Sequence, residues 1–212
     1  MKIITFGDSI TDAGRNREAN VRRKEALGFG YPLLLQAELG FENPEKYLVI
    51  NRGIGGHRIV DLYARVKKDV WNLQPDVLSI LIGVNDVWHD LSEQPNGVDL
   101  VRFEKVYRML LDDTLAVLPN VKIMLIEPFV AHGVTTDLNV EHFAQVKDYA
   151  KVVRKLAAEY DLPFLPLQEK FDELEQKAAP EYWTADGVHP TVMGAKMIAN
   201  EWIKLFKAEI DK

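Results

Sequence analysis

Short apolar runs alternate with longer amphipathic segments along the chain, and this alternation predicts its secondary structure. The run at residues 77–82 is almost continuously apolar, which is typical of a parallel strand buried on both faces. We expect strands at residues 3–6, 47–51, 77–82, 121–126 and 163–167. Apolar residues spaced three and four apart predict helices at residues 31–39, 59–73, 99–118, 140–160 and 191–206.

Strands that alternate with helices predict parallel pairing, because parallel strands need a crossover that a helix commonly supplies. The expected fold is therefore of the α/β class, a three-layer α/β/α sandwich around a five-stranded parallel sheet, with residues 1–212 forming a single domain. Gly40 is expected to end the first long helix. Residues 12–30 and 132–139 fit the regular scheme poorly, and both follow strands, so we expect them at the ligand-binding edge of the sheet.

Composition and charge narrow the range of functions. The net charge is −6 and no basic block occurs, so neither nucleic acid nor a membrane is expected as a partner. The chain has no cysteine, which excludes disulfides, thiolate catalysis and cysteine-based metal sites. No apolar run is long enough for a signal peptide or a membrane helix, and we expect a cytoplasmic protein.

Ser9 stands just past the end of the first strand, at the edge where open α/β sheets bind ligands. A serine hydroxyl is a poor nucleophile until a base takes its proton. The stretch Asp186-Gly187-Val188-His189-Pro190 offers such a base, with a carboxylate three residues upstream to orient the imidazole. Taken alone, the same pattern also describes an ordinary turn before a helix.

Two further segments supply groups that acyl transfer needs. A glycine-rich turn at residues 51–56 follows the second strand, and Asn85 follows the third. Backbone N–H groups of such a turn and a fixed amide can hold the negative oxygen of a tetrahedral intermediate. A nucleotide-binding turn and a helix cap are the alternatives, but neither G-x-G-x-x-G nor a P-loop pattern occurs.

These segments together resemble the SGNH hydrolases, also called the GDSL esterase/lipase family. The resemblance rests on Gly7-Asp8-Ser9-Ile10, Gly56, Gly83-Val84-Asn85-Asp86 and Asp186-Gly187-Val188-His189-Pro190, which occur in the family's order. It implies a flavodoxin-like sandwich, with Ser9 as nucleophile, His189 as base and Asp186 as its orienting carboxylate. It further implies an oxyanion hole of Ser9, Gly56 and Asn85, and no metal or organic cofactor.

A narrower resemblance is to intracellular acetyl-xylooligosaccharide esterases. It rests on residues 7–15, 27–31 and 83–88, and on Trp183 before the last motif. It implies a serine esterase that removes acetyl groups from short sugars such as xylo-oligosaccharides, and a homo-oligomer. The residues expected to contact the substrate are Asp8, Arg15, Tyr31, Trp88 and Trp183, although core packing would equally explain either tryptophan.

Two other functions stay open. An acyl-CoA thioesterase or lysophospholipase of the same fold would prefer longer acyl chains. A lipase would have a long apolar acyl groove, whereas residues 88–100 are mostly polar, which favours a smaller substrate. A non-catalytic carbohydrate-binding protein would lack a member of the triad or the oxyanion hole, and none is missing here. The sequence does not say which sugar or acyl chain reaches Ser9, nor what residues 12–30 contribute.

Overall fold

A parallel sheet organises the computed structural model, which describes residues 1–211. Its five strands pair in the order β2-β1-β3-β4-β5, and they are β1 (Lys2–Gly7), β2 (Leu48–Gly53), β3 (Val77–Leu81), β4 (Lys122–Ile126) and β5 (Phe164–Leu165). The five-stranded parallel sheet is thus confirmed, and its order is that of flavodoxin-like sheets. That residues 1–212 form a single domain stays a prediction.

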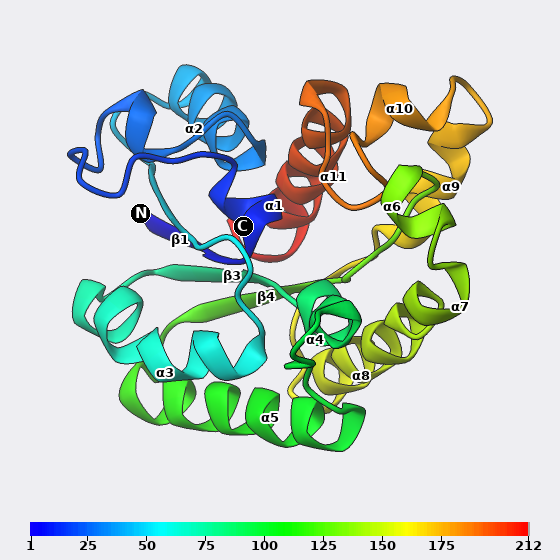
Figure 1. Cartoon of the computed structure of the whole chain (residues 1–212). Coiled ribbons are helices and arrows are strands. Elements are labelled where there is room, and N and C mark those ends of the chain that lie inside the picture. Colours follow the sequence, from blue (N-terminus) through cyan, green and yellow to red (C-terminus); the bar gives the residue numbers. More distant parts are fainter. Residues whose placement is uncertain (212) are drawn as a thin grey trace.

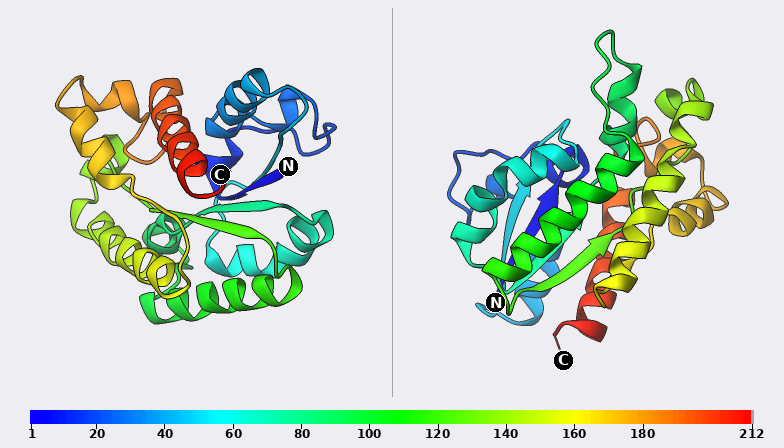
Figure 2. Two further views of the ribbon diagram at one scale, coloured as in Figure 1. Left: turned by 180° about the vertical axis from the view of Figure 1, so that it is seen from behind. Right: turned by 90° about the horizontal axis from the view of Figure 1, so that it is seen from below.

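Helices cover both faces of the sheet, as Figure 1 and the view from behind in Figure 2 show. One face carries α2 (Tyr31–Glu42) and α11 (Val192–Glu209), which contact each other. The other face carries α3 (Ile59–Asp69), α5 (Leu100–Val117) and α8 (Val146–Glu159), packed in that order. The predicted three-layer sandwich is confirmed.

The buried apolar side chains show why this sequence forms these layers. Every residue of β3 is buried, as the continuous apolar run at that position predicts. From α11, Trp202 is completely buried, and its Nε1 donates to Ser79 Oγ at 2.9 Å. A buried polar group costs stability unless it is hydrogen-bonded, so this bond lets a tryptophan anchor α11 on the sheet.

The helices differ from their predicted limits. Helix α2 continues through Gly40 and ends at Glu42, so the prediction that Gly40 ends it was wrong. Asn43 caps the helix, and its N–H donates to the carbonyl oxygen of Leu39. The segment predicted at 140–160 is divided into α7 (Val140–Phe143) and α8. Helix α3 stops at Asp69, and a short 3-10 turn, η2 (Trp71–Leu73), follows it.

Several short elements have no apolar periodicity and were not predicted from the sequence. They are α1 (Ser9–Asp12), η1 (Lys24–Ala26), α4 (Val84–Trp88), η3 (His89–Leu91), α6 (Val134–Asp137), α9 (Gln168–Glu175) and α10 (Pro180–Trp183). Most of them span one turn or little more, which is too short for a stripe of residues three and four apart to repeat. Their place matters, because α1 and α4 begin directly after β1 and β3, at the carboxyl edge of the sheet.

Candidate active site

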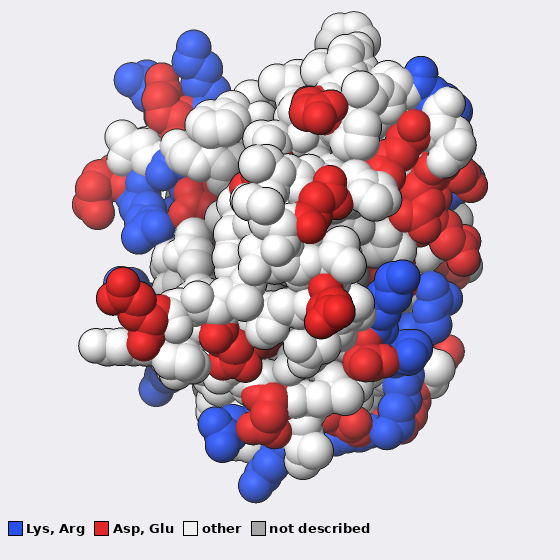
Figure 3. All heavy atoms as spheres, turned by 45° about the vertical axis from the view of Figure 1, so that its right-hand side comes forward, with Lys and Arg blue, Asp and Glu red and all other residues white. Residues whose placement is uncertain are grey.

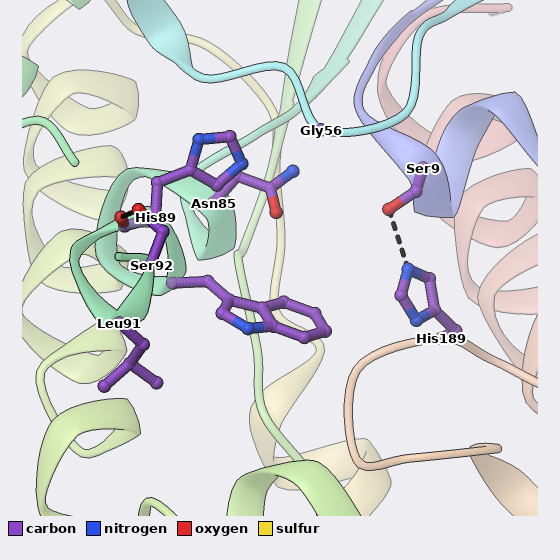
Figure 4. A pocket seen from close by; sticks show the side chains of 8 residues that line it. Ser9, Gly56, Asn85, His89, Leu91, Ser92 and His189 are labelled. Carbon is purple, nitrogen blue, oxygen red and sulfur yellow. Dashed lines mark hydrogen bonds between the residues drawn. The ribbon is translucent and has the colours of Figure 1, made fainter. Parts of the chain in front are cut away.

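Ser9 is held at the carboxyl end of the central strand β1. Asp8 caps helix α1, because its Oδ1 accepts the N–H of Ile10 at 3.0 Å, and Ser9 is therefore the first residue of that helix. Gly7 allows the close approach to β3 that this turn needs, since a Cβ there would lie 2.4 Å from the carbonyl oxygen of Leu81. The Oγ of Ser9 lies 2.8 Å from Nε2 of His189 (Figure 4).

The His189 ring is oriented by Asp186 within the turn between α10 and α11. Oδ2 of Asp186 lies 2.7 Å from Nδ1 of His189. Oδ1 accepts the backbone N–H groups of Val188 and His189 at 2.9 and 2.8 Å. Since one carboxylate oxygen is fixed by the backbone and the other by the ring, Nε2 is left facing Ser9. Residues 180 positions apart in the sequence thus meet at hydrogen-bonding distance.

These contacts shift the pKa values of Asp186 and His189 in opposite directions. Burial by itself would raise the pKa of Asp186, but the hydrogen bonds from His189 and Val188 outweigh it and lower that pKa to about 2. The hydrogen bond with Asp186 raises the pKa of His189, although burial works against it. The pair therefore keeps a carboxylate ready to stabilise a protonated imidazole.

The stretch after β4 supports the Asp186 turn from behind. Ala131 N–H donates to the carbonyl oxygen of Gly187 at 2.8 Å, and Thr135 N–H donates to that of Asp186 at 3.1 Å. Gly133 lies so close that a Cβ on it would be 2.2 Å from the carbonyl carbon of Asp186. Residues 132–139, expected at the ligand-binding edge, thus brace the turn that holds His189.

Gly56 and Asn85 face the serine across a cavity. Gly56 has a φ of +79°, a conformation that glycine adopts without strain. The amide of Asn85, in α4, donates one N–H to the carbonyl oxygen of His57 at 3.1 Å, which fixes the amide and leaves its second N–H for another partner. The cavity, here called the catalytic cavity, has a volume of about 390 Å³ and is lined by Ser9, Gly56, Asn85, Trp88, His89, Leu91, Ser92 and His189 (Figure 4).

Arg15, predicted to bind substrate, lies behind the glycine-rich turn. Its Nε donates to the carbonyl oxygen of Gly53 at 2.7 Å, and burial lowers its pKa to about 10. Nearby, Oδ2 of Asp12 accepts the N–H of Gly55 at 3.0 Å. The first part of the 12–30 loop is therefore tied to the turn that carries Gly56, and Arg15 does not line the catalytic cavity.

Three other predicted contact residues also lie outside the catalytic cavity. Asp8 is buried beneath Ser9, and burial raises its pKa to about 7. Tyr31 is buried, with its hydroxyl 3.0 Å from Thr11 Oγ1. Trp183 packs edge-on against the ring of Tyr182 at 4.8 Å. Trp183 is also partly buried and packs against the hydrophobic core, in line with the alternative of core packing.

The structure brings Trp88 to the site and adds residues that sequence reasoning missed. The ring of Trp88 lies 5.9 Å from that of His189 and packs edge-on against Phe143 at 5.5 Å. His89, Leu91 and Ser92 follow Trp88 and continue the same wall. Their position directly after the Gly-x-Asn-Asp motif was the available signal. The pKa of the His89 ring is lowered by burial and by Arg58, which favours a neutral imidazole in this wall.

Residues 1–211 offer neither a cluster of metal-ligating side chains nor a helix that could cross a membrane. No group of three or more His, Asp or Glu side chains in that range could hold a metal ion. Within the same range, no helix is both long and apolar enough to cross a membrane.

The chain is similar in sequence and in fold to known proteins. Residues 5–197 match the GDSL-like Lipase/Acylhydrolase family. An acetylxylan esterase of Geobacillus stearothermophilus is 36% identical over 208 residues, which cover 96% of this chain and 92% of that protein. The crystal structure of an acetylxylan esterase from that organism matches with a TM-score of 0.84 and 33% identity, over 96% of this chain and 93% of the other.

A second solved structure is similar over nearly the whole length. It is a protein of Parabacteroides merdae described as a GDSL-like lipase, with a TM-score of 0.88 and 37% identity. The match covers 98% of this chain and 96% of that one. The range that matches the family includes the segments that carry Ser9, Gly56, Asn85 and His189. The chain therefore belongs to the GDSL-like lipase/acylhydrolase family and is a carboxylic ester hydrolase.

Proposed function

We propose that this enzyme removes acetyl groups from short carbohydrates such as xylo-oligosaccharides, with Ser9, His189 and Asp186 as its catalytic triad. The observation that carries the proposal is the alignment of the three side chains, with distances of 2.8 Å from Ser9 to His189 and 2.7 Å from His189 to Asp186. The similarity to acetylxylan esterases supports the choice of substrate.

In this mechanism Ser9 Oγ attacks the ester carbonyl carbon while His189 Nε2 takes its proton. Asp186 stabilises the imidazolium, which then gives the proton to the leaving alcohol oxygen. A water molecule, deprotonated by His189, attacks the acyl-enzyme and releases acetate and free Ser9. Every proton that leaves a nucleophile is thus returned to a leaving group, and the steps use only groups of the protein, the ester and one water molecule.

The negative oxygen of each tetrahedral intermediate needs donors that are already in place. The backbone N–H groups of Ser9 and Gly56 and the side-chain amide of Asn85 are proposed for this role. The bond from Asn85 to His57 supports it, because an amide fixed before the reaction loses no freedom when charge develops. The oxyanion side of the site is therefore built from α1, the glycine-rich turn and α4.

The walls of the catalytic cavity favour a small, uncharged ester over acyl-CoA. Among residues 1–211, no lysine or arginine lines it, whereas phosphate groups are commonly bound by such side chains. Figure 3 shows scattered acidic residues over the middle of the face that it displays, with Lys and Arg toward its margins. A polyanionic leaving group would therefore find no cationic partner among the described residues that line the catalytic cavity. The homo-oligomer and the cytoplasmic location stay predictions.

The test compares acetate release from acetylated xylo-oligosaccharides with hydrolysis of acyl-CoA and of lysophospholipid. Ser9→Ala should lower kcat on the sugar ester by about four decades or more, following triad enzymes. Ser92→Ala, which removes another hydroxyl from the same cavity, is the matched control and should lose far less. A Ser9→Ala enzyme with near wild-type turnover would show that Ser9 is not the nucleophile, and a preference for acyl-CoA would overturn the substrate.

A further inference from the structure

A second, larger hollow opens on the other side of the Ser9–His189 pair. It has a volume of about 580 Å³ and is here called the α11 groove. One wall comes from α1 and the end of the 12–30 loop, and the other from the start of α11. The side chains that define it are Ile10, Phe29 and Tyr31 on the first wall, and Val192, Ala195 and Ile198 on the second.

The α11 groove presents apolar surface and little hydrogen-bonding capacity. The Tyr31 hydroxyl is paired with Thr11 Oγ1 at 3.0 Å, and Thr191 Oγ1 donates to the carbonyl oxygen of Tyr182 at 2.7 Å. Phe29 and Val192, which line the groove, are 70% and 65% exposed. Single exposed apolar residues are common, but two that border one hollow leave apolar surface that a ligand could remove from water.

The position of the groove indicates which part of an ester would enter it. Ser9 and His189 line both hollows, whereas Gly56 and Asn85 line the catalytic cavity. If these two hold the carbonyl oxygen, the acyl group stays on their side, beside Trp88. The leaving alcohol oxygen has to receive its proton from His189 Nε2, which borders the α11 groove. The rest of the alcohol can therefore extend past His189 into that groove.

We propose that the α11 groove binds the alcohol part of the ester and selects alcohols that carry an apolar group, alkyl or aromatic, near the esterified oxygen. The proposal rests on the proposed acetylesterase function and narrows its substrate to acetyl esters with such a group, for example alkyl or aryl glycosides. Short sugars without an aglycone would then leave Phe29 and Val192 in water.

Two series of simple esters test this. Along ethyl, butyl and hexyl acetate, kcat/KM should rise about tenfold or more, since each methylene that is fully buried contributes up to about fourfold. Along ethyl acetate, butyrate and hexanoate kcat/KM should rise less steeply, because the added carbons enter the catalytic cavity, whose lining includes the polar side chains of Asn85, His89 and Ser92. Alkyl alcohols of similar acidity are used so that the leaving-group chemistry stays constant.

Val192→Asn and Phe29→Ala should each reduce the hexyl-to-ethyl acetate ratio severalfold. Val101→Asn is the matched control, because Val101 is 80% exposed in the first turn of α5 and lines neither hollow. The proposal is overturned if kcat/KM does not rise with alcohol length, or if the hexyl-to-ethyl acetate ratio is unchanged in both groove variants. A kcat/KM that rises more steeply with acyl length than with alcohol length assigns the groove to the acyl chain and also overturns the proposal.

Two further outcomes remain distinct. If Val192→Asn lowers the molar mass measured by light scattering, a second copy of the chain covers the groove and the alcohol-site proposal is wrong. The proposed function itself fails if the wild-type enzyme releases acetate from none of the esters, or if Ser9→Ala releases acetate as fast as the wild type. The two failures are therefore separated by whether a Ser9-dependent acetylesterase activity exists at all.

Discussion

Two histidine–aspartate pairs in this enzyme have almost the same geometry and very different surroundings. Nδ1 of His189 lies 2.7 Å from Asp186, and Nδ1 of His132 lies 2.8 Å from Asp137. The first pair faces Ser9, whereas the His132 and Asp137 side chains are 67% and 51% exposed. A histidine beside a carboxylate is thus not by itself a catalytic pair.

The ionisation of the two histidines does not separate them either. Hydrogen bonding to its aspartate raises the pKa of each, and Glu175 raises that of His132 further. What differs is the other ring nitrogen, because Nε2 of His189 lies 2.8 Å from a hydroxyl at the end of a central strand. A histidine–aspartate pair therefore forms a site of this kind only where a hydroxyl, here that of Ser9, is held against the second ring nitrogen.

Of the substitutions that test the difference between the two pairs, Asp186→Asn should have the largest effect. The amide would present an N–H to Nδ1 and favour the wrong tautomer, so kcat should fall by about four decades, as in triad proteases. Asp137→Asn is the matched control, since it changes the exposed pair in the same way, and it should leave kcat near the wild-type value. Equal losses from both substitutions, measured by acetate release, would contradict the assignment.

Asp8 sharpens the comparison, because it is a carboxylate close to His189 that belongs to no pair. Its pKa is raised by burial from 3.8 to about 7, so ionisation favours the unfolded chain between these values. The free energy of unfolding should therefore fall as the pH rises from 4 to 7, by up to about 4 kcal/mol at 1.36 kcal/mol per pKa unit. Asp8→Asn keeps the acceptor for Ile10 N–H and should remove this loss.

The measurement is urea unfolding of wild type and Asp8→Asn between pH 4 and 8. The variant should be the more stable above pH 7 and equal to wild type near pH 4, and it should keep most of its activity. Glu93→Gln, which neutralises an exposed carboxylate and leaves Asp8 in place, is the control and should keep the wild-type dependence on pH. If Asp8→Asn instead lost activity as Asp186→Asn does, proximity of a carboxylate rather than its hydrogen bond would govern His189.

The smallest expected effect is a shift of the pH profile. His189 has to be neutral to accept the proton of Ser9, and its pKa is raised above 6.5, so kcat/KM should increase with pH through a midpoint above 6.5. The residual activity of Asp186→Asn should have a lower midpoint, because the hydrogen bond that raises the pKa is lost. Asp137→Asn should not move it, and a midpoint that follows Asp137 would identify His132 as the titrating group.

Much of the fold could be predicted because the patterns that specify it are local. The run at 77–82 became β3, and the stripe at 99–118 became α5 with a difference of one residue at each end. The short helices α1 and α4, of four and five residues, could not be predicted in this way, because the 3.6-residue period cannot repeat within them. They exist because Asp8 and Gly83 allow the chain to turn where β1 and β3 end.

By itself, the sequence determined the order of strands and helices and the identity of the residues that meet at Ser9, because periodicity and motifs are properties of neighbouring residues. Only the tertiary structure decided where each side chain went. It buried Arg15 behind Gly53, left His132 exposed and formed the α11 groove from residues 10–31 and 189–198. Arg15 is buried by a contact with a residue 38 positions away, and the α11 groove joins segments more than 150 residues apart, which no local pattern records.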